Sequence, residues 1–294
     1  MSVLMQALLP FKKMTQMKKL FDELSYKVCE QTTKKYSTSF SLGILALSPK
    51  IRPAIYAIYG YVRLADEIVD SFHEYDKEKL LERLRRQTDT ALEEEISLNP
   101  ILQAFQETVH RYGIDRNLIN QFLKSMEMDL RKVDYNTELY KEYILGSAEV
   151  VGLMCLYVFT AGCPHRFAEL KPYAMKLGSA FQKINFLRDL KDDYQTLGRT
   201  YFPDVDLTCF DHWMKKHIEK DIRIEFDEAL IGIRSLPVSS RFGVYLAYRY
   251  YVSLFKKIIR TSPQKIKTER VRISNGEKFS LMISSYMQYK LNWL

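Results

Sequence analysis

The stretch from Ala180 to Asp193 (AFQKINFLRDLKDD) combines an apolar stripe with a polar stripe that a buried helix would not normally carry. The apolar stripe repeats at close to helical periodicity and consists of Phe181, Ile184, Leu187 and Leu190. The polar stripe advances by three, four and four residues, through Gln182, Asn185, Asp189 and Asp193. Side chains at these spacings stack along one face of a helix. Two carboxylates four residues apart repel each other unless a cation lies between them. Mg2+ is the natural candidate, because it takes oxygen ligands and is usually shared with substrate phosphates.

A second acidic pair makes this interpretation stronger, since one such pair alone is more often two solvated surface carboxylates. Asp66 and Asp70 again lie four residues apart, in an apolar helical segment. Arg63 precedes Asp66 by three residues, and Arg188 directly precedes Asp189. A guanidinium can hold phosphate oxygens in a bidentate fork. The two acidic faces therefore predict a cage for a metal-bound diphosphate, and the alternative is two surface salt-bridge ladders.

The composition limits the class of protein. The 294 residues are 47% hydrophobic and 13% aromatic, which is typical of a globular chain with a large core. Only 11 residues are glycine, and neither GxGxxG nor GxxxxGK[ST] occurs, which argues against dinucleotide and P-loop nucleotide folds. The net charge of +8 favours anionic partners. The cysteines form no CxxC and are expected to be buried free thiols, and the histidines show no zinc spacing.

The chain shows neither a convincing membrane span nor a signal peptide. The longest uncharged apolar run, about residues 150–163, is shorter than the roughly 20 residues that a spanning helix needs, and we interpret it as a core helix. Residues 1–11 have an apolar patch without a basic start or a cleavage site. We expect residues 1–16 to be an N-terminal extension, a candidate for disorder, and residues 17–294 to form one catalytic domain.

Helical patterns follow one another without a strand, a repeat or a Gly/Ser-rich linker. We expect helices at about 18–35, 50–70, 76–95, 101–112, 116–132, 143–163, 166–195, 208–221, 223–235, 239–261 and 277–291. The hydroxyl-rich run at 36–41 either caps a helix or binds phosphate, and the basic segment 265–272 is either a solvated loop or a flap over an anion. Glu149 needs a partner if it is buried in its apolar run. The prediction is one all-α domain whose helices surround a central apolar cavity, with the two Asp-rich motifs at its mouth.

Several motifs resemble the squalene/phytoene synthase family, the head-to-head trans-isoprenyl diphosphate synthases. They are YSTSFSLG (36–43), RLADEIVD (63–70), YILGSAEVVG (143–152), FQKINFLRDLKDDYQTLGRTYFP (181–203), YYVSLFKKI (250–258) and ERV (269–271). The resemblance covers residues 20 to 275, and within the family the chain looks most like the carotenoid-forming phytoene synthases of bacteria. It departs from the family pattern at Tyr36, Glu67 and Glu149, where members often have histidine, aspartate and a small residue.

The resemblance implies an isoprenoid synthase fold and a role for each matching residue. Mg2+, with Mn2+ as an alternative, would be held by Asp66, Asp70, Asn185, Asp189 and Asp193. The residues implied in catalysis are these four aspartates with Tyr59, Arg63 and Arg188. Those implied in substrate binding are Ser37, Ser39, Phe40, Tyr143, Val151, Gly152, Gln182, Asn185, Tyr250 and Arg270.

The implied reaction joins two geranylgeranyl diphosphates through the cyclopropylcarbinyl intermediate prephytoene diphosphate, giving 15-cis-phytoene, the first committed step of carotenoid biosynthesis (EC 2.5.1.32). NADPH is not expected, because phytoene formation ends in loss of a proton. The alternatives are a squalene or dehydrosqualene synthase that uses two farnesyl diphosphates, and a non-catalytic helical assembly factor. A cytoplasmic protein bound peripherally at the inner face of the cell membrane is expected, as a monomer or weak homodimer. A nucleic-acid partner is not expected.

Overall fold

The computed structural model describes residues 3–131, 135–192, 201–203 and 210–291, and it gives side chains from residue 17 onward except for Asp192. Its elements in chain order are α1 (Val3–Tyr36), α2 (Thr38–Leu45), α3 (Arg52–Asp70), α4 (Lys77–Glu94), α5 (Pro100–Tyr112), α6 (Arg116–Asp129), α7 (Thr137–Ile144), the π-helix η1 (Leu145–Glu149), α8 (Val150–Phe159), α9 (Pro164–Asp192), α10 (His212–Ser235), α11 (Val238–Arg260), α12 (Pro263–Thr268) and α13 (Asn275–Lys290). These described ranges contain no strand, and the predicted all-α class is confirmed.

Local sequence explains most of the helix starts. Side-chain oxygens of Asp76, Asn99, Asp115, Asp211 and Ser274 each accept a backbone N–H in the first turn of the helix that follows. Gly113 ends α5 in the left-handed region, at φ 65°, where glycine meets no steric penalty. These stop and start signals account for the agreement between predicted and observed helices from residue 76 to residue 130.

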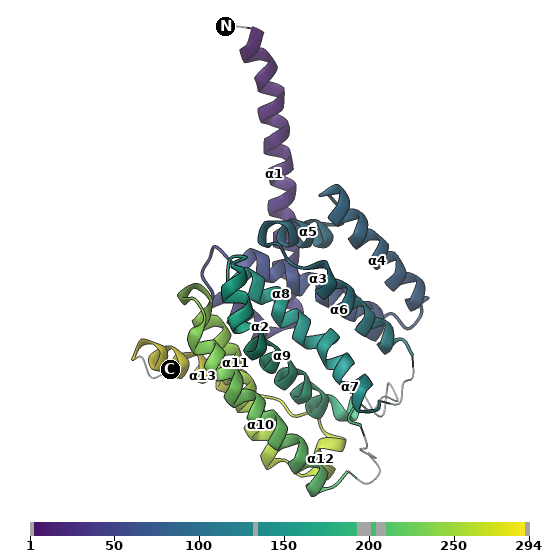
Figure 1. Cartoon of the computed structure of the whole chain (residues 1–294), viewed down its shortest axis with the longest axis vertical. Helices are drawn as coiled ribbons and strands as arrows, with labels where there is room; N and C mark the ends of the chain where they lie inside the picture. The colour runs from purple at the N-terminus through teal and green to yellow at the C-terminus, as the bar shows by residue number, and fades with distance from the viewer. Residues whose placement is uncertain (1–2, 132–134, 193–200, 204–209, 292–294) are drawn as a thin grey trace.

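The described helices build two large hydrophobic cores and a smaller third cluster, and a cavity lies between the two large cores. One core joins α1, α3, α4, α5, α6 and α8, and the other joins α7, α9, α10, α11 and α12. In Figure 1 α9 runs through the middle of the bundle, with α7 and α8 on one side and α10 and α11 on the other. Its polar stripe is therefore placed inside the protein, where a solvated salt-bridge ladder would not lie.

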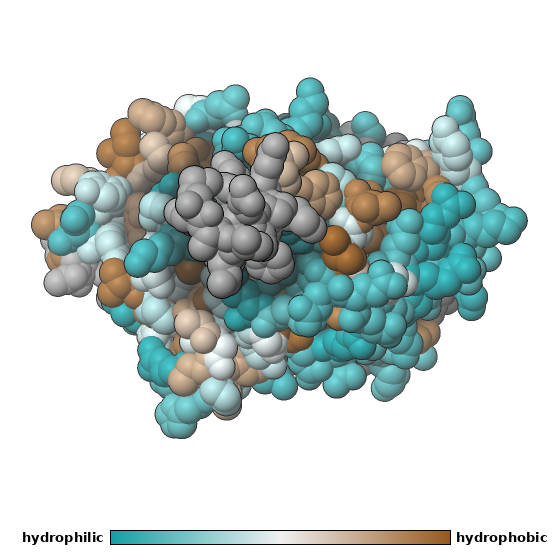
Figure 2. Space-filling view, turned by 90° about the horizontal axis from the view of Figure 1, so that it is seen from above, coloured by the Kyte–Doolittle hydropathy of each residue, from teal (hydrophilic) through white to brown (hydrophobic). Residues whose placement is uncertain are grey.

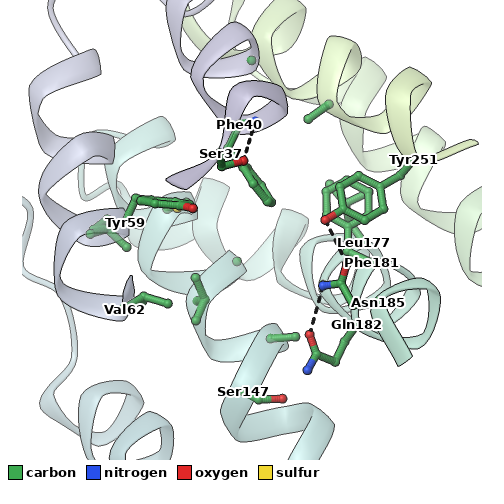
Figure 3. Close-up of a pocket in the computed structure, with 18 of the residues that line it drawn as sticks. Ser37, Phe40, Tyr59, Val62, Ser147, Leu177, Phe181, Gln182, Asn185 and Tyr251 are labelled. Carbon is green, nitrogen blue, oxygen red and sulfur yellow. Dashed lines mark hydrogen bonds between the residues drawn. The ribbon is translucent and has the colours of Figure 1, made fainter. Parts of the chain in front are cut away.

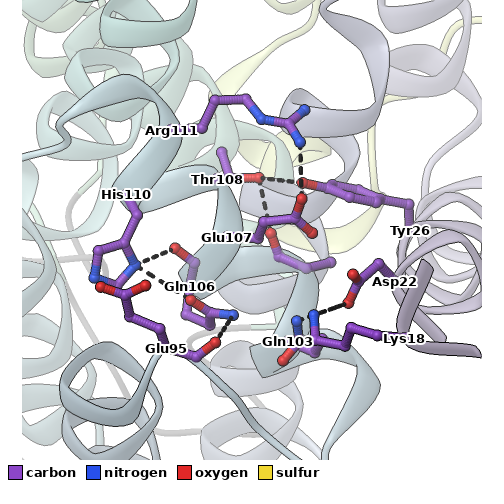
Figure 4. A network of polar contacts seen from close by, with 11 residues as sticks. Lys18, Asp22, Tyr26, Glu95, Gln103, Gln106, Glu107, Thr108, His110 and Arg111 are labelled. Atoms are coloured by element: carbon purple, nitrogen blue, oxygen red, sulfur yellow. Dashed lines mark hydrogen bonds and ion pairs between the residues drawn. The ribbon is translucent and has the colours of Figure 1, made fainter. Parts of the chain in front are cut away.

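A polar network fastens the described part of α1 to α5 (Figure 4). Gln103 donates to the Asp22 carboxylate at 2.9 Å, and Lys18 pairs with the same carboxylate at 2.5 Å. Tyr26 and Thr108 share a hydrogen bond of 3.5 Å between their hydroxyls. Helix α1 is therefore attached to the body from Lys18 onward. In Figure 1 its N-terminal part projects beyond the other helices, and the boundary predicted at residue 16 stays a prediction.

Two predicted helices differ from the structure. The expected helix at 143–163 is three pieces, α7, η1 and α8, because Leu145–Glu149 adopts π-helical hydrogen bonding. The expected break near residue 222 is absent, since α10 is continuous over His212–Ser235 and buries Ile222 completely. The prediction of buried thiols holds for Cys29 and is wrong for Cys163, which is exposed, while Cys209 lies outside the described residues.

One stretch within the described residues, Thr137–Phe159, is long and apolar enough to cross a membrane by length and composition, with a mean hydropathy of 1.5. Sequence analysis did not predict a span there. The stretch packs against α6 and α9 inside the bundle. In its 18-residue apolar part, 44% of the residues are buried. Core helices commonly have the same length and composition, so the stretch is weak evidence for a membrane span.

Candidate active site

The cavity between the two cores has a volume of about 650 Å³, within the size range of ligand-binding pockets. Of the predicted site residues, those with described side chains all line it: Ser37, Ser39, Phe40, Tyr59, Arg63, Asp66, Asp70, Tyr143, Val151, Gly152, Gln182, Asn185, Arg188, Asp189, Tyr250 and Arg270. Asp193 lies outside the described residues. The fold thus brings six separated segments of the sequence to one cavity.

Helix α3 supplies the first acidic wall. Asp66 and Asp70 face the cavity, and the Arg63 guanidinium lies 4.0 Å from the Asp66 carboxylate. Burial, reinforced by the charges of Asp70 and Asp129, raises the pKa of Asp66 to about 7, although Arg63 opposes the shift. The side chain keeps 34% of its surface accessible, but that surface opens into the cavity. This wall therefore presents two carboxylates to the cavity, and the surroundings of Asp66 disfavour its ionised form.

Arg63 is held between the acidic wall and an aromatic ring. It donates to the Glu67 carboxylate, and its guanidinium lies 4.4 Å from the centre of the Tyr36 ring. Burial acts to raise the pKa of Glu67, but hydrogen bonds from Ser71 and Arg63 outweigh it and the pKa is lowered. The Nε of Arg63 is buried and has no hydrogen-bond partner among the described residues. This unpartnered N–H group beside the cavity is suited to donate a hydrogen bond to an anionic ligand.

Helix α9 supplies the second wall. Arg188 donates from Nε to Asp189 at 2.9 Å, and Arg270 pairs with the same carboxylate at 2.8 Å. Hydrogen bonding to Asp189 and its charge raise the pKa of Arg188, against the opposing effect of burial. Arg270 comes from the extended segment after α12, so the basic segment at 265–272 reaches the cavity with this residue. Both arginines have a carboxylate partner that diphosphate oxygens could replace.

A hydrogen-bonded chain continues the polar stripe of α9 (Figure 3). Asn185 donates to the Gln182 side chain at 3.4 Å, and the Tyr251 hydroxyl donates to Asn185 at 3.2 Å. Sequence analysis singled out Tyr250, which also lines the cavity, but it missed its neighbour Tyr251. Burial raises the pKa of Tyr251 to about 12, so the hydroxyl keeps its proton and acts as a donor.

Aromatic rings form the wall beyond the polar groups. Phe181 and Tyr251 stack with ring centres 3.8 Å apart, and Phe40 lies 5.8 Å from Tyr59 and 6.1 Å from Tyr251. Figure 3 shows Tyr59 and the Phe181–Tyr251 pair on opposite sides of the space, with Phe40 between them. The Ser37 hydroxyl caps α2 by accepting from the backbone N–H of Phe40 at 3.2 Å, which identifies the hydroxyl-rich run as a helix cap that also borders the cavity.

A buried carboxylate at the end of α6 was missed by sequence analysis. Asp129 lines the cavity and is 6% exposed. It accepts a hydrogen bond of 2.7 Å from Tyr143 and one of 3.2 Å from Tyr201. Burial raises the pKa of Tyr143 well above its ordinary value. The sequence signal was faint, because the partners of Asp129 are 14 and 72 residues away.

The π-helix shapes the wall opposite α9. Gly146 packs so closely on α6 that an added Cβ would lie 2.7 Å from the Ser125 Cβ. Ser147 faces the cavity, and its buried hydroxyl has no hydrogen-bond partner among the described residues (Figure 3). Gly152 lets α8 approach the Ala174 carbonyl on α9, at 3.3 Å from an added Cβ. Small residues here serve both close packing and the cavity.

Glu149 is not among the residues that line the cavity. It lies in the field of Glu225, Lys176 and Lys183. Glu225 itself pairs with Lys183 at 2.8 Å and accepts from Ser179 at 2.9 Å. Burial, followed by repulsion from Glu225, raises the pKa of Glu149 to about 7.

Replacing Glu149 with glutamine is expected to make the protein more stable above neutral pH. A carboxyl with a raised pKa in the folded state binds more protons folded than unfolded, so stability falls as the pH rises from about 4.5 to about 7. Glutamine does not titrate, so the variant does not lose stability in this pH range. We expect its free energy of unfolding to exceed that of wild type by roughly 1–2 kcal/mol at pH 8 and to differ little from it at pH 5. Urea unfolding at both pH values measures it. Glu74→Gln, at an exposed site, is the control, and equal curves for Glu149→Gln and wild type would contradict the prediction.

The acidic wall fits a hard divalent cation. Within the described residues no three His, Cys, Asp or Glu side chains form a ready metal cluster. Asp66 and Asp70 are, however, two carboxylates that line the cavity from one helix, and Asp189 faces the same cavity from α9. Mg2+ keeps several non-protein ligands and is commonly bound through one or two carboxylates together with substrate phosphates. The donor set is therefore of the kind that binds Mg2+ when a diphosphate is present.

Comparisons with known proteins agree with this geometry. The model of the family described as squalene/phytoene synthase matches residues 33–277. The chain is 29% identical over 288 residues to phytoene synthase 1, chloroplastic, of Solanum lycopersicum, covering 89% of this chain and 68% of the relative. It is 28% identical over 287 residues to phytoene synthase 2, chloroplastic, of the same species, covering 89% of this chain and 90% of the relative.

Solved structures share the fold. A dehydrosqualene synthase crystallised with a ligand superimposes with a TM-score of 0.77 at 23% identity, covering 92% of this chain and 98% of the other. Squalene synthase HpnC from Alicyclobacillus acidocaldarius superimposes with a TM-score of 0.70 at 22% identity, covering 80% of this chain and 93% of the other. Because the family model spans most of the chain and the fold agrees throughout, this protein belongs to the squalene/phytoene synthase family.

Proposed function

We propose that this protein is a phytoene synthase: it joins two C20 geranylgeranyl diphosphates head to head into 15-cis-phytoene. Members of its family are prenyltransferases of this reaction class. The observation that supports the proposal is a single cavity whose carboxylates and arginines pass directly into an aromatic and aliphatic wall. A charged diphosphate and a long hydrocarbon chain on one molecule need both surfaces.

The polar residues bind and orient the two diphosphates. Mg2+, held by Asp66, Asp70 and Asp189 with Asn185 and Asp193 as further candidate ligands, supplies positive charge that stabilises the leaving diphosphate. Arg188 and Arg270 exchange their bonds to Asp189 for phosphate oxygens. Arg63 contributes its unpartnered Nε from the α3 side. Mn2+ is the expected substitute for Mg2+.

The reaction proceeds in two steps that balance without a reductant. In the first, one diphosphate leaves, C1 of that chain bonds to C2 and C3 of the other, and a proton is lost, giving prephytoene diphosphate. In the second, the remaining diphosphate leaves, the cyclopropane rearranges into a C1–C1′ bond, and a second proton is lost. NADPH has no role in this sequence.

The apolar residues protect the cations formed on the way. Water would quench them, so the wall must exclude it. The rings of Phe40, Tyr59, Phe181 and Tyr251 surround the space beside the polar groups and can face a cation. Asp129 and Tyr143 hold a buried negative charge at the same wall. A released diphosphate or a hydroxyl accepts the departing protons.

The choice of C20 chains rests on the phytoene synthase relatives. The runner-up is a squalene or dehydrosqualene synthase that uses two C15 farnesyl diphosphates, the activities named for the solved structures of the same fold. We further propose a cytoplasmic protein bound at the inner face of the membrane, as a monomer or weak homodimer without a nucleic-acid partner, because the expected product dissolves only in a bilayer.

The test is to incubate purified protein and Mg2+ with C15 or C20 all-trans prenyl diphosphate, with and without NADPH, and to analyse the hydrocarbons. Phytoene from the C20 substrate, unchanged by NADPH, is the expected result. A C30 product from the C15 substrate would leave the assignment of the active site unchanged and would identify the protein as a squalene or dehydrosqualene synthase. Absence of product from both substrates would overturn the enzymatic proposal and favour the non-catalytic assembly factor.

A further inference from the structure

The last described helix, α13, carries an apolar face that points away from the protein. Its outward residues Phe279, Ile283, Tyr286 and Met287 are 59%, 50%, 48% and 55% exposed, and the Tyr286 ring also contacts Phe242 of α11, with ring centres 5.8 Å apart. They recur at spacings of four, three and one, which keeps them on one side of the helix. Figure 2 shows hydrophobic atoms along the edge of the molecule on which Figure 1 places α13, whereas the opposite edge, over α4, is mostly hydrophilic.

The other side of α13 is anchored to α11, which is itself a wall of the cavity. Phe242 contacts the Tyr289 ring at 5.0 Å between ring centres, and Tyr245 donates to Gln288 at 3.0 Å. A capping box between Ser274 and Glu277 starts the helix. The outward apolar row is therefore held on a folded, capped helix, and its exposure does not come from fraying.

The segment that carries α13 also holds nearly all of the excess positive charge. Residues 256–290 contain nine Lys or Arg and two Glu, a net charge of +7 in a chain whose total is +8. Exposed cations of this segment include Lys256, Arg260, Lys265, Arg272 and Lys290. A second copy docking through the same face would bring two such charges together, so the charge argues against a symmetric dimer and for an anionic surface.

The first turn of α13 lies beside cavity residues. The Lys278 ammonium is 5.6 Å from the ring centre of Tyr250, which lines the cavity. Lys257 connects the segments, because it pairs with Glu277 at 3.7 Å and donates to the Arg272 carbonyl at 2.7 Å. Arg270, two residues from Arg272, pairs with Asp189 in the cavity.

We propose that α13 and the basic segment 256–272 form a docking surface for an anionic lipid bilayer. The outward row inserts among the lipids and the surrounding cations meet their headgroups, as in amphipathic helices that lie in the interface. Docked in this way, the cavity residues next to Lys278 lie near the lipid surface. The purpose of the docking rests on the proposed function, since prenyl substrates and a hydrocarbon product partition into bilayers, but the binding itself does not.

The test is flotation of the full chain with vesicles of phosphatidylcholine alone or mixed with phosphatidylglycerol. We expect binding to the mixed vesicles that weakens at high salt, and much weaker binding to phosphatidylcholine alone. Phe279→Gln combined with Ile283→Gln should weaken binding by about 10- to 100-fold. Lys256→Glu combined with Lys290→Glu should weaken it and flatten its salt dependence.

The matched control is Ile96→Gln combined with Leu98→Gln. These side chains are 43% and 93% exposed in the α4–α5 connection, and their replacement should leave binding unchanged. Circular dichroism and turnover in detergent micelles show that each variant is folded. Equal flotation of the α13 variant and wild type, or no flotation of wild type, would overturn the proposal. A dimer in light scattering that the α13 variant dissociates would instead assign the face to a subunit interface. If wild type floats but forms no product in micelles, the proposed function fails and the docking surface stands.

Discussion

Asp66→Asn is expected to lower kcat/KM about a thousandfold while leaving the fold intact. Asp66 faces the cavity next to Asp70, and burial together with the charge of Asp70 raises its pKa, so a cation bound at this wall would stabilise the ionised carboxylate. Replacing the carboxylate removes a metal ligand where the leaving diphosphate gathers charge, which is worth about 4 kcal/mol in the transition state. The measurement is product formation at saturating Mg2+, with a Mg2+ titration of both proteins.

The same substitution should not destabilise the metal-free protein. Since the folded state disfavours the ionised form of Asp66, the neutral asparagine is expected to match or exceed the thermal stability of wild type at pH 8. Asp89→Asn, on an exposed face of α4, is the control for loss of a carboxylate and should retain full activity. Near-normal turnover of Asp66→Asn would refute the assignment of α3 to the metal-bound diphosphate.

Asp129→Asn should lower both activity and stability, and it probes a residue that sequence analysis missed. Asp129 accepts hydrogen bonds from Tyr143 and Tyr201, and its charge acts on Asp66. An asparagine presents an amide N–H group where an acceptor is needed, so we expect a stability loss of about 1–3 kcal/mol. Activity should fall about 100-fold, because the charge beside the acidic wall is lost and Tyr143 is no longer held in place.

Two tyrosine variants separate these effects. Tyr143→Phe removes the shorter bond, 2.7 Å, from a residue that lines the cavity, and Tyr201→Phe removes the longer one, 3.2 Å. We expect activity to decrease in the order wild type, Tyr201→Phe, Tyr143→Phe, Asp129→Asn. Steady-state kinetics with urea unfolding of each protein measure it. Wild-type turnover in Asp129→Asn would mean that the carboxylate only supports the fold.

The sequence by itself determined the fold class and most of the site. Amphipathic stripes with a period near 3.6, together with Asp, Asn and Gly at the caps, predicted the helices because these signals act within a few residues. The stripes through Asp66 and Asp189 could be found for the same reason, since i, i+4 spacing on one helix sets which side chains share a face. Their assembly around one cavity followed from the burial of the apolar stripe that accompanies each.

Only the tertiary structure decided what depends on residues far apart in the chain. Asp129 gained its role from Tyr201, 72 residues away, and Arg270 reached Asp189 from beyond α12. Glu149 turned out to lie in the field of Glu225 because η1 and α10 both pack on α9. The π-hydrogen bonding of Leu145–Glu149 adjusts the chain where Gly146 is pressed against Ser125. Such contacts are set by packing between helices, and the spacing of residues within one helix carries no record of them.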